Sequence, residues 1–346
     1  MGFTYGINDE HKMRIALSKK ANITISEDMS IFGVTKETSF INTIFFNYKD
    51  TAKSSISSYL EQRRIELNST LASKGVDLKS ADAIIAALLS HEEEQLTEKV
   101  KQYCSTKGSN KLYHINNRNI EYLQDDCNEN EYYGDRPSQY IRSVVEEYCQ
   151  LPFIERERIF HKEIYDIVES ACSEKRVLKI RTSNHVYRVY PYKIMPDTLN
   201  TRAYLVCYSQ GTDKPDSPKK ISSFSMTKLN KKPTKLVQTF RLTKDEIRKI
   251  EEKITEYSPS FLIGIPEQIK VQLTPAGVKS YQTKLFSRPA KIEELPDNIY
   301  VFDCSPWQAL NYFFSFGKDA QIISPEELKT EFIDAYKEAL ESYHLP

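Results

Sequence analysis

A run of short β-type segments that is also strongly basic constrains this chain more than any other feature. Residues 175–241 contain fifteen Lys or Arg and three acidic residues, a net charge of +12 in a chain of 346 residues whose total charge is zero. Five segments here are rich in β-branched and aromatic residues: 177–181, 186–194, 203–208, 221–226 and 236–240. Strands of this length and spacing predict a small β-barrel, and its charge would attract polyanions.

The first fifty residues show a different pattern. The alternation in Met13–Leu17 predicts a short, half-buried strand, and Ser18 can cap a helix that follows it. Residues 19–32 are compatible with a strand or a helix, and Gly33 ends that segment. Thr35 can cap a helix over residues 40–48. We therefore expect a strand, a helix, a glycine turn and a second helix.

Residues 51–150 form a helical spacer in this interpretation. Apolar residues recur at helical spacing from 51 to 104, and helical periodicity returns at 138–150 and 154–173. Residues 105–137 are rich in Asn and acidic residues without a clear period, so we expect a linker or an irregular excursion there.

A third unit follows the basic segment. Strands are predicted at 268–274, 290–292 and 299–304, and helices at 275–283, 306–316 and 325–343. This order is typical of a compact α+β sandwich.

Composition excludes several classes of protein. The Met1–Lys20 stretch is polar and charged and there is no long apolar span, so we expect a cytoplasmic protein without a signal peptide or a membrane segment. The six cysteines form no CxxC pair, which argues against a metal site. The six histidines are far apart, and there is no Gly-rich phosphate loop, GxSxG or HExxH. We expect no enzyme activity, no cofactor and no metal.

The barrel segment offers cations and aromatic rings for binding a nucleic-acid strand. Alternation along 202–208 places Arg202, Tyr204 and Tyr208 on one face and the core residues on the other. Rings that stack on bases and cations that follow phosphates are what single-strand binding requires. The competing interpretation is that the tyrosines fill a small core and the lysines are solvated. The predicted RNA-binding residues are Arg181, His185, Arg188, Tyr190, Arg202, Tyr204, Tyr208, Lys219, Lys220, Ser225 and Lys228.

The order of residues through this segment resembles the WYL-domain family of bacterial regulators. The resemblance rests on the runs Arg188–Tyr192, Ala203–Tyr208 and Phe224–Leu229. It continues into Phe316-Gly317 and Ser324–Leu328, and covers about residues 150–345. The family's signature Trp is Ala203 here, and the Arg of its third strand is Ser225. Because a hydroxyl cannot replace a planar guanidinium fork, the family's particular ligand is not carried over.

The N-terminal unit resembles a ribbon-helix-helix domain, with Lys12–Leu17 as the groove-reading strand. With both features in one chain, the sequence resembles the WYL accessory proteins of type VI-D CRISPR systems. That similarity implies binding of single-stranded RNA and modulation of an RNA-guided CRISPR nuclease. Because a lone strand leaves its backbone groups unpaired, a ribbon-helix-helix head also implies a homodimer.

The predicted architecture is α+β with four parts. These are a ribbon-helix-helix at 1–50, a helical spacer at 51–150, a WYL domain with an Sm-like or SH3-like barrel at 151–241, and a ferredoxin-like C-terminal domain at 242–346. An alternative function is a DNA-binding transcriptional regulator, in which Lys12 and Arg14 enter a major groove and the barrel senses a nucleic acid or nucleotide. Six basic and six acidic residues through Asp50 argue against strong DNA binding by the head alone.

Overall fold

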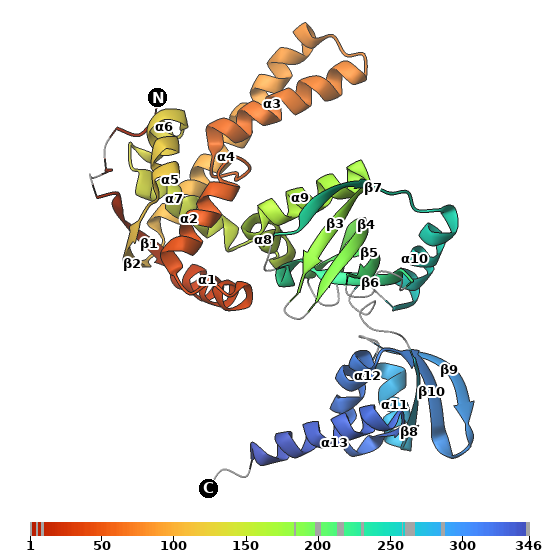
Figure 1. Ribbon diagram of the computed structural model, residues 1–346. Helices are drawn as coiled ribbons and strands as arrows, with labels where there is room; N and C mark the ends of the chain where they lie inside the picture. The colour runs from red at the N-terminus through yellow and green to blue at the C-terminus, as the bar shows by residue number, and fades with distance from the viewer. Residues whose placement is uncertain are drawn as a thin grey trace. The chain divides into compact units, whose positions relative to one another are not determined.

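The structure is a computed structural model of the full chain (Figure 1). It describes all residues except 1, 5, 8–9, 183–184, 198–201, 213–217, 230–231, 258, 260–266, 285–287 and 344–346, and the side chains of 78–80 and 256–257. The chain forms two compact units, residues 1–162 and residues 163–346. No described helix is long and apolar enough to cross a membrane.

The first unit contains a two-stranded antiparallel ribbon. Strand β1 (Lys12–Ser18) pairs along its whole length with β2 (Gly108–His114) of the same chain. The strand expected at Met13–Leu17 is confirmed, and its alternate residues Met13, Ile15 and Leu17 are buried as predicted. The expectation that this strand has no partner within the chain was wrong. Because β2 satisfies one edge of β1, strand pairing does not by itself require a second chain.

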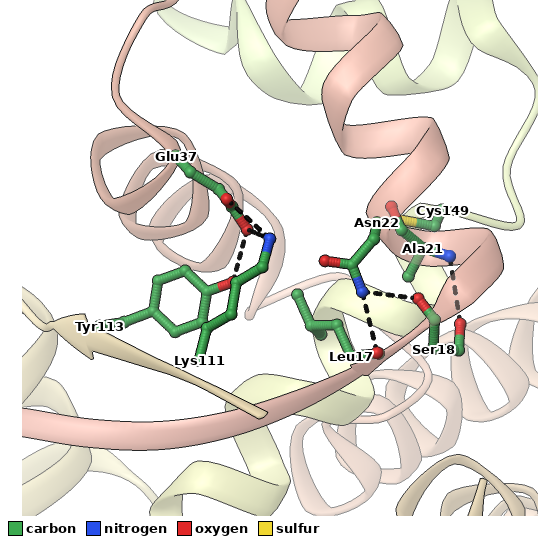
Figure 2. Close-up of polar contacts among 8 residues, drawn as sticks. All are labelled: Leu17, Ser18, Ala21, Asn22, Glu37, Lys111, Tyr113 and Cys149. Atoms are coloured by element: carbon green, nitrogen blue, oxygen red, sulfur yellow. Dashed lines mark hydrogen bonds and ion pairs between the residues drawn. The ribbon is translucent and has the colours of Figure 1, made fainter. Parts of the chain in front are cut away.

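Helix α1 (Lys19–Phe32) starts and ends at the residues that the sequence indicates. The Ser18 hydroxyl accepts a hydrogen bond from the Ala21 amide at 3.1 Å, as Figure 2 shows, and Gly33 ends the helix with φ of 69°. The ambiguous segment 19–32 is therefore a helix. Helix α2 (Glu37–Tyr48) begins after Lys36, not at the expected Thr35 cap. Glu37 instead accepts hydrogen bonds from Lys111 and Tyr113 of β2 (Figure 2).

The remaining helices of this unit surround a shared core. They are α3 (Ile56–Ser73), α4 (Leu78–Ser105), α5 (Asn117–Glu121), the π-helix η1 (Tyr122–Asp126), α6 (Asn130–Tyr133), α7 (Pro137–Tyr148) and α8 (Phe153–Phe160). The α3–α4 pair forms a hairpin that projects from the rest (Figure 1). The predicted linker at 105–137 was wrong: Tyr113, Ile120 and Leu123 belong to the core. The segment is mostly polar, and its few apolar residues do not recur at a period that would predict a helix or a strand.

Glu129 makes the stability of the first unit depend on pH. It is fully buried and accepts the amides of Ser57 and Ser58 at the start of α3. Burial raises the pKa of this carboxyl to about 7. Between about pH 4.5 and 7 the folded chain therefore holds a proton that the unfolded chain has lost, and stability falls as pH rises.

We expect Glu129→Gln to remove most of this dependence. From pH 5 to 8 the parent should lose about 2–3 kcal/mol more unfolding free energy than the variant, because one unit of pKa difference is about 1.4 kcal/mol and about two units lie above pH 5. Urea unfolding at both pH values measures the difference. Equal pH dependence in parent and variant would contradict this assignment.

The second unit begins with α9 (Lys162–Glu174) and a five-stranded antiparallel sheet. Its strands are β3 (Arg176–Arg181), β4 (Val186–Asp197), β5 (Arg202–Gly211), β6 (Lys220–Ser225) and β7 (Thr234–Thr239), in the order β6-β5-β4-β3-β7. The short helix η2 (Met226–Lys228) follows β6, and α10 (Lys244–Tyr257) follows β7. All five predicted strands are confirmed, but the described strands do not close into a barrel.

The sheet is nevertheless strongly curved. Tyr187 lies opposite Gly211 at one end of β5, whereas Phe224 lies opposite Leu205 toward the other end. The rings of Tyr187 and Phe224 still approach to 5.4 Å between centroids. A flat sheet would hold these rings much farther apart, because a strand extends by about 3.3 Å per residue.

A second sheet follows, in the order β11-β8-β10-β9 with antiparallel neighbours. Its elements are β8 (Glu267–Leu273), α11 (Pro275–Thr283), β9 (Ala290–Leu295), η4 (Pro296–Asn298), β10 (Ile299–Cys304), α12 (Pro306–Phe313), η5 (Phe314–Asp319), β11 (Ala320–Ser324) and α13 (Glu326–Glu341). The sequence interpretation missed β11, a short strand that follows the sharp turn at Gly317.

Candidate nucleic-acid interface

The hairpin of β3 and β4 presents three cations on one face. Lys179 lies directly opposite Arg188, and Arg181 follows Lys179 on the same face of β3. The alternate residues Leu178 and Ile180 are buried on the other face. The alternation of apolar and basic residues in β3 therefore fixes which way the cations project.

Lys219 joins this group from the segment that leads into β6. Its ammonium lies 4.0 Å from the centre of the Tyr190 ring. Tyr190 is on the same face of β4 as Arg188, two residues along the strand. We refer to Lys179, Arg181, Arg188 and Lys219 as the cation cluster.

In the described part of the chain, the cation cluster has no acidic partner, unlike four other basic residues of the segment. Within the described chain, Arg176 and Lys235 contact Glu174, Lys193 contacts Glu251, and Lys232 contacts Glu163. No carboxylate in the described part of the chain pairs with a cluster residue. Like charges directly opposite each other in a sheet are destabilising. The pairing of Lys179 with Arg188 is therefore unfavourable unless an anion binds there.

The tyrosines predicted to stack on bases are buried. Tyr190, Tyr204 and Tyr208 are 5%, 7% and 7% exposed. Tyr190 and Tyr208 pack in a cluster with Ile250 of α10, and the Tyr208 hydroxyl donates to the Glu246 carbonyl at 3.3 Å. The expected open face of β5 is therefore covered, and truncating these tyrosines would act first on stability.

The sequence interpretation missed α10, the helix that covers this face. Its apolar residues Ile250 and Ile254 are one helical turn apart, and Thr243 exchanges capping hydrogen bonds with Glu246 at its start. This capping pattern and spacing were available in the sequence. The residues predicted as core, Ala203, Leu205 and Cys207, are buried as expected.

The remaining predicted residues divide between the two ends of the sheet. Arg202 lies opposite Asp197, at the end of β5 away from Arg188. Tyr204 and Ser225 face each other near that end. The Ser225 hydroxyl is buried without a partner in the described chain. Lys228 follows in η2 and is exposed. These residues are not part of the cation cluster.

An aromatic pair lies beside the β3–β4 turn. His185 is exposed, and its ring lies 6.1 Å from the half-buried ring of Tyr187, edge to face. Lys220, also exposed, starts β6 opposite Ser209, and alternation sends it to the face away from Lys219. His185 is therefore the predicted aromatic residue best placed to meet a base near the cation cluster.

The residues predicted for DNA binding lie on the first unit. Lys12 and Arg14 are on the exposed face of the β1–β2 ribbon, opposite His114 and Leu112 respectively. Lys12 also forms an ion pair with Glu10 at 2.7 Å. In the described residues, no group of three or more His, Cys, Asp or Glu side chains is arranged to hold a metal ion.

Comparison with known proteins gives one informative likeness. No protein-family model matches the chain, and no curated protein matches it. A solved structure described as a CRISPR Cas-related protein aligns with a TM-score of 0.70 at 22% identity, covering 96% of this chain and 94% of that chain. Proteasome accessory factor B/C of Arthrobacter aurescens aligns with a TM-score of 0.32 at 12% identity, over 68% of this chain and 37% of that chain. The first likeness shows a shared fold along nearly the whole chain.

Proposed function

We propose that this chain is a non-enzymatic, cytoplasmic accessory protein that binds single-stranded RNA and modulates an RNA-guided CRISPR RNase. The RNA strand would cross the end of the β3–β4 hairpin, where Arg181 and Arg188 are exposed and which lies beyond the residues that pack with α10. Its phosphates would contact the cation cluster, and a base would stack on His185 near the β3–β4 turn. The proposal keeps the predicted ligand but moves it away from the buried tyrosines.

The gathering of cations on one hairpin, without acidic partners among the described residues, carries this proposal. Arg176, Lys193, Lys232 and Lys235 of the same segment are neutralised by Glu174, Glu251 or Glu163. Lys179 and Arg188 instead face each other. A row of phosphates would relieve their repulsion and release counterions, which is the main source of affinity in nucleic-acid binding. Arginine and an exposed aromatic ring are suited to a flexible single strand with accessible bases.

The CRISPR part of the proposal draws on the structural likeness. The similar solved structure is described as CRISPR Cas-related, and its fold matches this chain from end to end. The WYL and ribbon-helix-helix resemblances in the sequence suggest the same context. The antiparallel order β11-β8-β10-β9, with helices between the strands, is compatible with the proposed ferredoxin-like domain.

A second candidate is the DNA-binding regulator. The exposed face of the β1–β2 ribbon carries Lys12 and Arg14, and a two-stranded ribbon of this kind fits a major groove.

We retain the homodimer as part of both proposals. The support from strand pairing is now weaker, because β1 has a partner strand within the chain. Sedimentation at micromolar concentration would test it.

Binding curves for three matched ligands test the proposed function. Single-stranded RNA, single-stranded DNA and duplex DNA of one sequence should be compared by fluorescence anisotropy at two salt concentrations. We expect the RNA to bind most tightly, to remain uncleaved by the chain alone, and to lose affinity at the higher salt. In the same preparation, the chain should change the cleavage rate of a type VI-D nuclease. Tighter binding of duplex DNA would favour the regulator instead.

A further inference from the structure

A basic cavity in the first unit lies outside the proposed RNA interface. Its volume is about 470 Å³, within the range of small-molecule sites. The start of α1, the last turns of α4 and the end of α7 form its walls. Its lining includes Lys19, Lys20, Lys99, Lys107 and Glu146.

Four lysines line this cavity against one carboxylate. Lys19 and Lys20 come from α1, Lys99 comes from α4, and Lys107 follows the end of α4. None of the four forms an ion pair in the described part of the chain. Lys101, a lysine of α4 outside the lining, does pair with an acid, Glu98, at 3.8 Å. Four ammonium groups around one cavity repel one another, and a bound anion would remove that cost.

The single carboxylate is already engaged. Glu146 of α7 accepts the Ser18 amide at 2.6 Å and the Ser18 hydroxyl at 2.8 Å. Figure 2 shows Ser18 and the start of α1, with Cys149 of the same wall beside Ala21. Both oxygens of Glu146 therefore hold the start of the helix, and the net charge presented to the cavity stays positive.

Lys99 and Lys107 are not needed to satisfy the last carbonyl groups of α4. Cations near a helix C-terminus commonly serve its last carbonyl groups. Here the buried Arg142 guanidinium donates to the Cys104 carbonyl at 2.9 Å and to the Thr106 carbonyl. The Thr106 amide and hydroxyl donate to the Gln102 carbonyl. The end of α4 is thus satisfied, and Lys99 and Lys107 remain available to a ligand.

We propose that this cavity binds the polyphosphate of a nucleotide, either free or at the 5′ end of an RNA strand. Lysine ammoniums are suited to phosphate oxygens as compact point charges. Four of them beside one engaged carboxylate match a di- or triphosphate better than a single phosphate. The side-chain amides of Gln102 and Gln150, which are exposed and also line the cavity, supply hydrogen-bonding groups for the nucleoside. This site is independent of the cation cluster in the second unit.

Calorimetric titration of the full chain tests the proposal. The probes are the four nucleoside triphosphates, one nucleoside, tripolyphosphate, sulfate, and one RNA with either a 5′-triphosphate or a 5′-hydroxyl. We expect a triphosphate to bind, and Lys19→Ala and Lys107→Ala each to weaken it about tenfold, as expected for a lost charge-assisted hydrogen bond. Lys101→Ala is the matched control and should change nothing. All three positions are exposed, so the variants should melt like the parent.

The arms of this titration separate the possible ligands. A 5′-triphosphate effect on RNA binding that Lys19→Ala removes would identify a strand end as the source, and binding of free triphosphates alone would identify a nucleotide. Tripolyphosphate binding as tightly as every nucleoside triphosphate would overturn the nucleoside part of the proposal. Equal binding of sulfate, or affinity unchanged in both lysine variants, would overturn the site. The triple variant Lys179→Ala, Arg181→Ala, Arg188→Ala should retain this binding even where RNA affinity is lost.

Discussion

Replacing Lys179, Arg181 and Arg188 together by alanine should weaken single-stranded RNA binding about 50-fold at 0.15 M salt. Each contact to a single strand releases about 0.7 counterion, so three lost contacts should flatten the slope of log affinity against log salt by about 2. The variant should fold as well as the parent, because the substitution removes the repulsion between Lys179 and Arg188. Fluorescence anisotropy over a salt series measures both quantities.

The same segment supplies a control with equal charge loss. Lys193, Lys232 and Lys235 are each paired with a carboxylate, so their triple alanine variant removes the same formal charge from cations that are already neutralised. We expect its RNA affinity to change less than about fivefold, since screened long-range attraction is all that it loses. If the two triple variants lose equal affinity, net charge alone attracts the RNA and the cation cluster is not a site.

Local alternation was enough to find most of the sheet that carries the cation cluster. The predicted segments 177–181 and 203–208 fall within β3 and β5. The same rule, applied to 177–181, separates the buried Leu178 and Ile180 from Lys179, which is not among the predicted RNA-binding residues. The period of alternation is a local property, so it can be read directly from the sequence.

The misassigned tyrosines show what local pattern leaves out. Alternation separates the two faces of β5 but does not say which face is solvated, and both are buried here. The covering helix α10 lies about forty residues beyond Tyr204. The same limit applies to β1, whose partner β2 is separated from it by four helices. Pairing and covering across such distances depend on tertiary packing, which a single strand's pattern cannot specify.

Aspartate 28 links three helices of the first unit through a buried ion pair. Asp28 of α1 is fully buried, and its two oxygens accept the Arg156 Nε and Nη2 groups of α8 at 2.7 and 2.9 Å. The Tyr148 hydroxyl of α7 donates to the same carboxylate at 2.8 Å. The Arg156 side chain is 14% exposed, so water cannot replace the lost partner easily. Removing Asp28 would leave a largely buried charge and an unsatisfied hydroxyl.

We therefore expect Asp28→Ala to cost about 3–5 kcal/mol of unfolding free energy, which for a unit of this size lowers the melting temperature by roughly 10 °C. The triple variant Asp28→Leu, Arg156→Met, Tyr148→Phe should recover most of that loss, because it removes the buried charge and the hydroxyl together. Calorimetry and urea unfolding measure both variants. RNA affinity of the folded Asp28→Ala protein should equal that of the parent, since the cation cluster lies in the other unit. A cost below about 1 kcal/mol would mean that α1, α7 and α8 are held by apolar packing, with the ion pair contributing little.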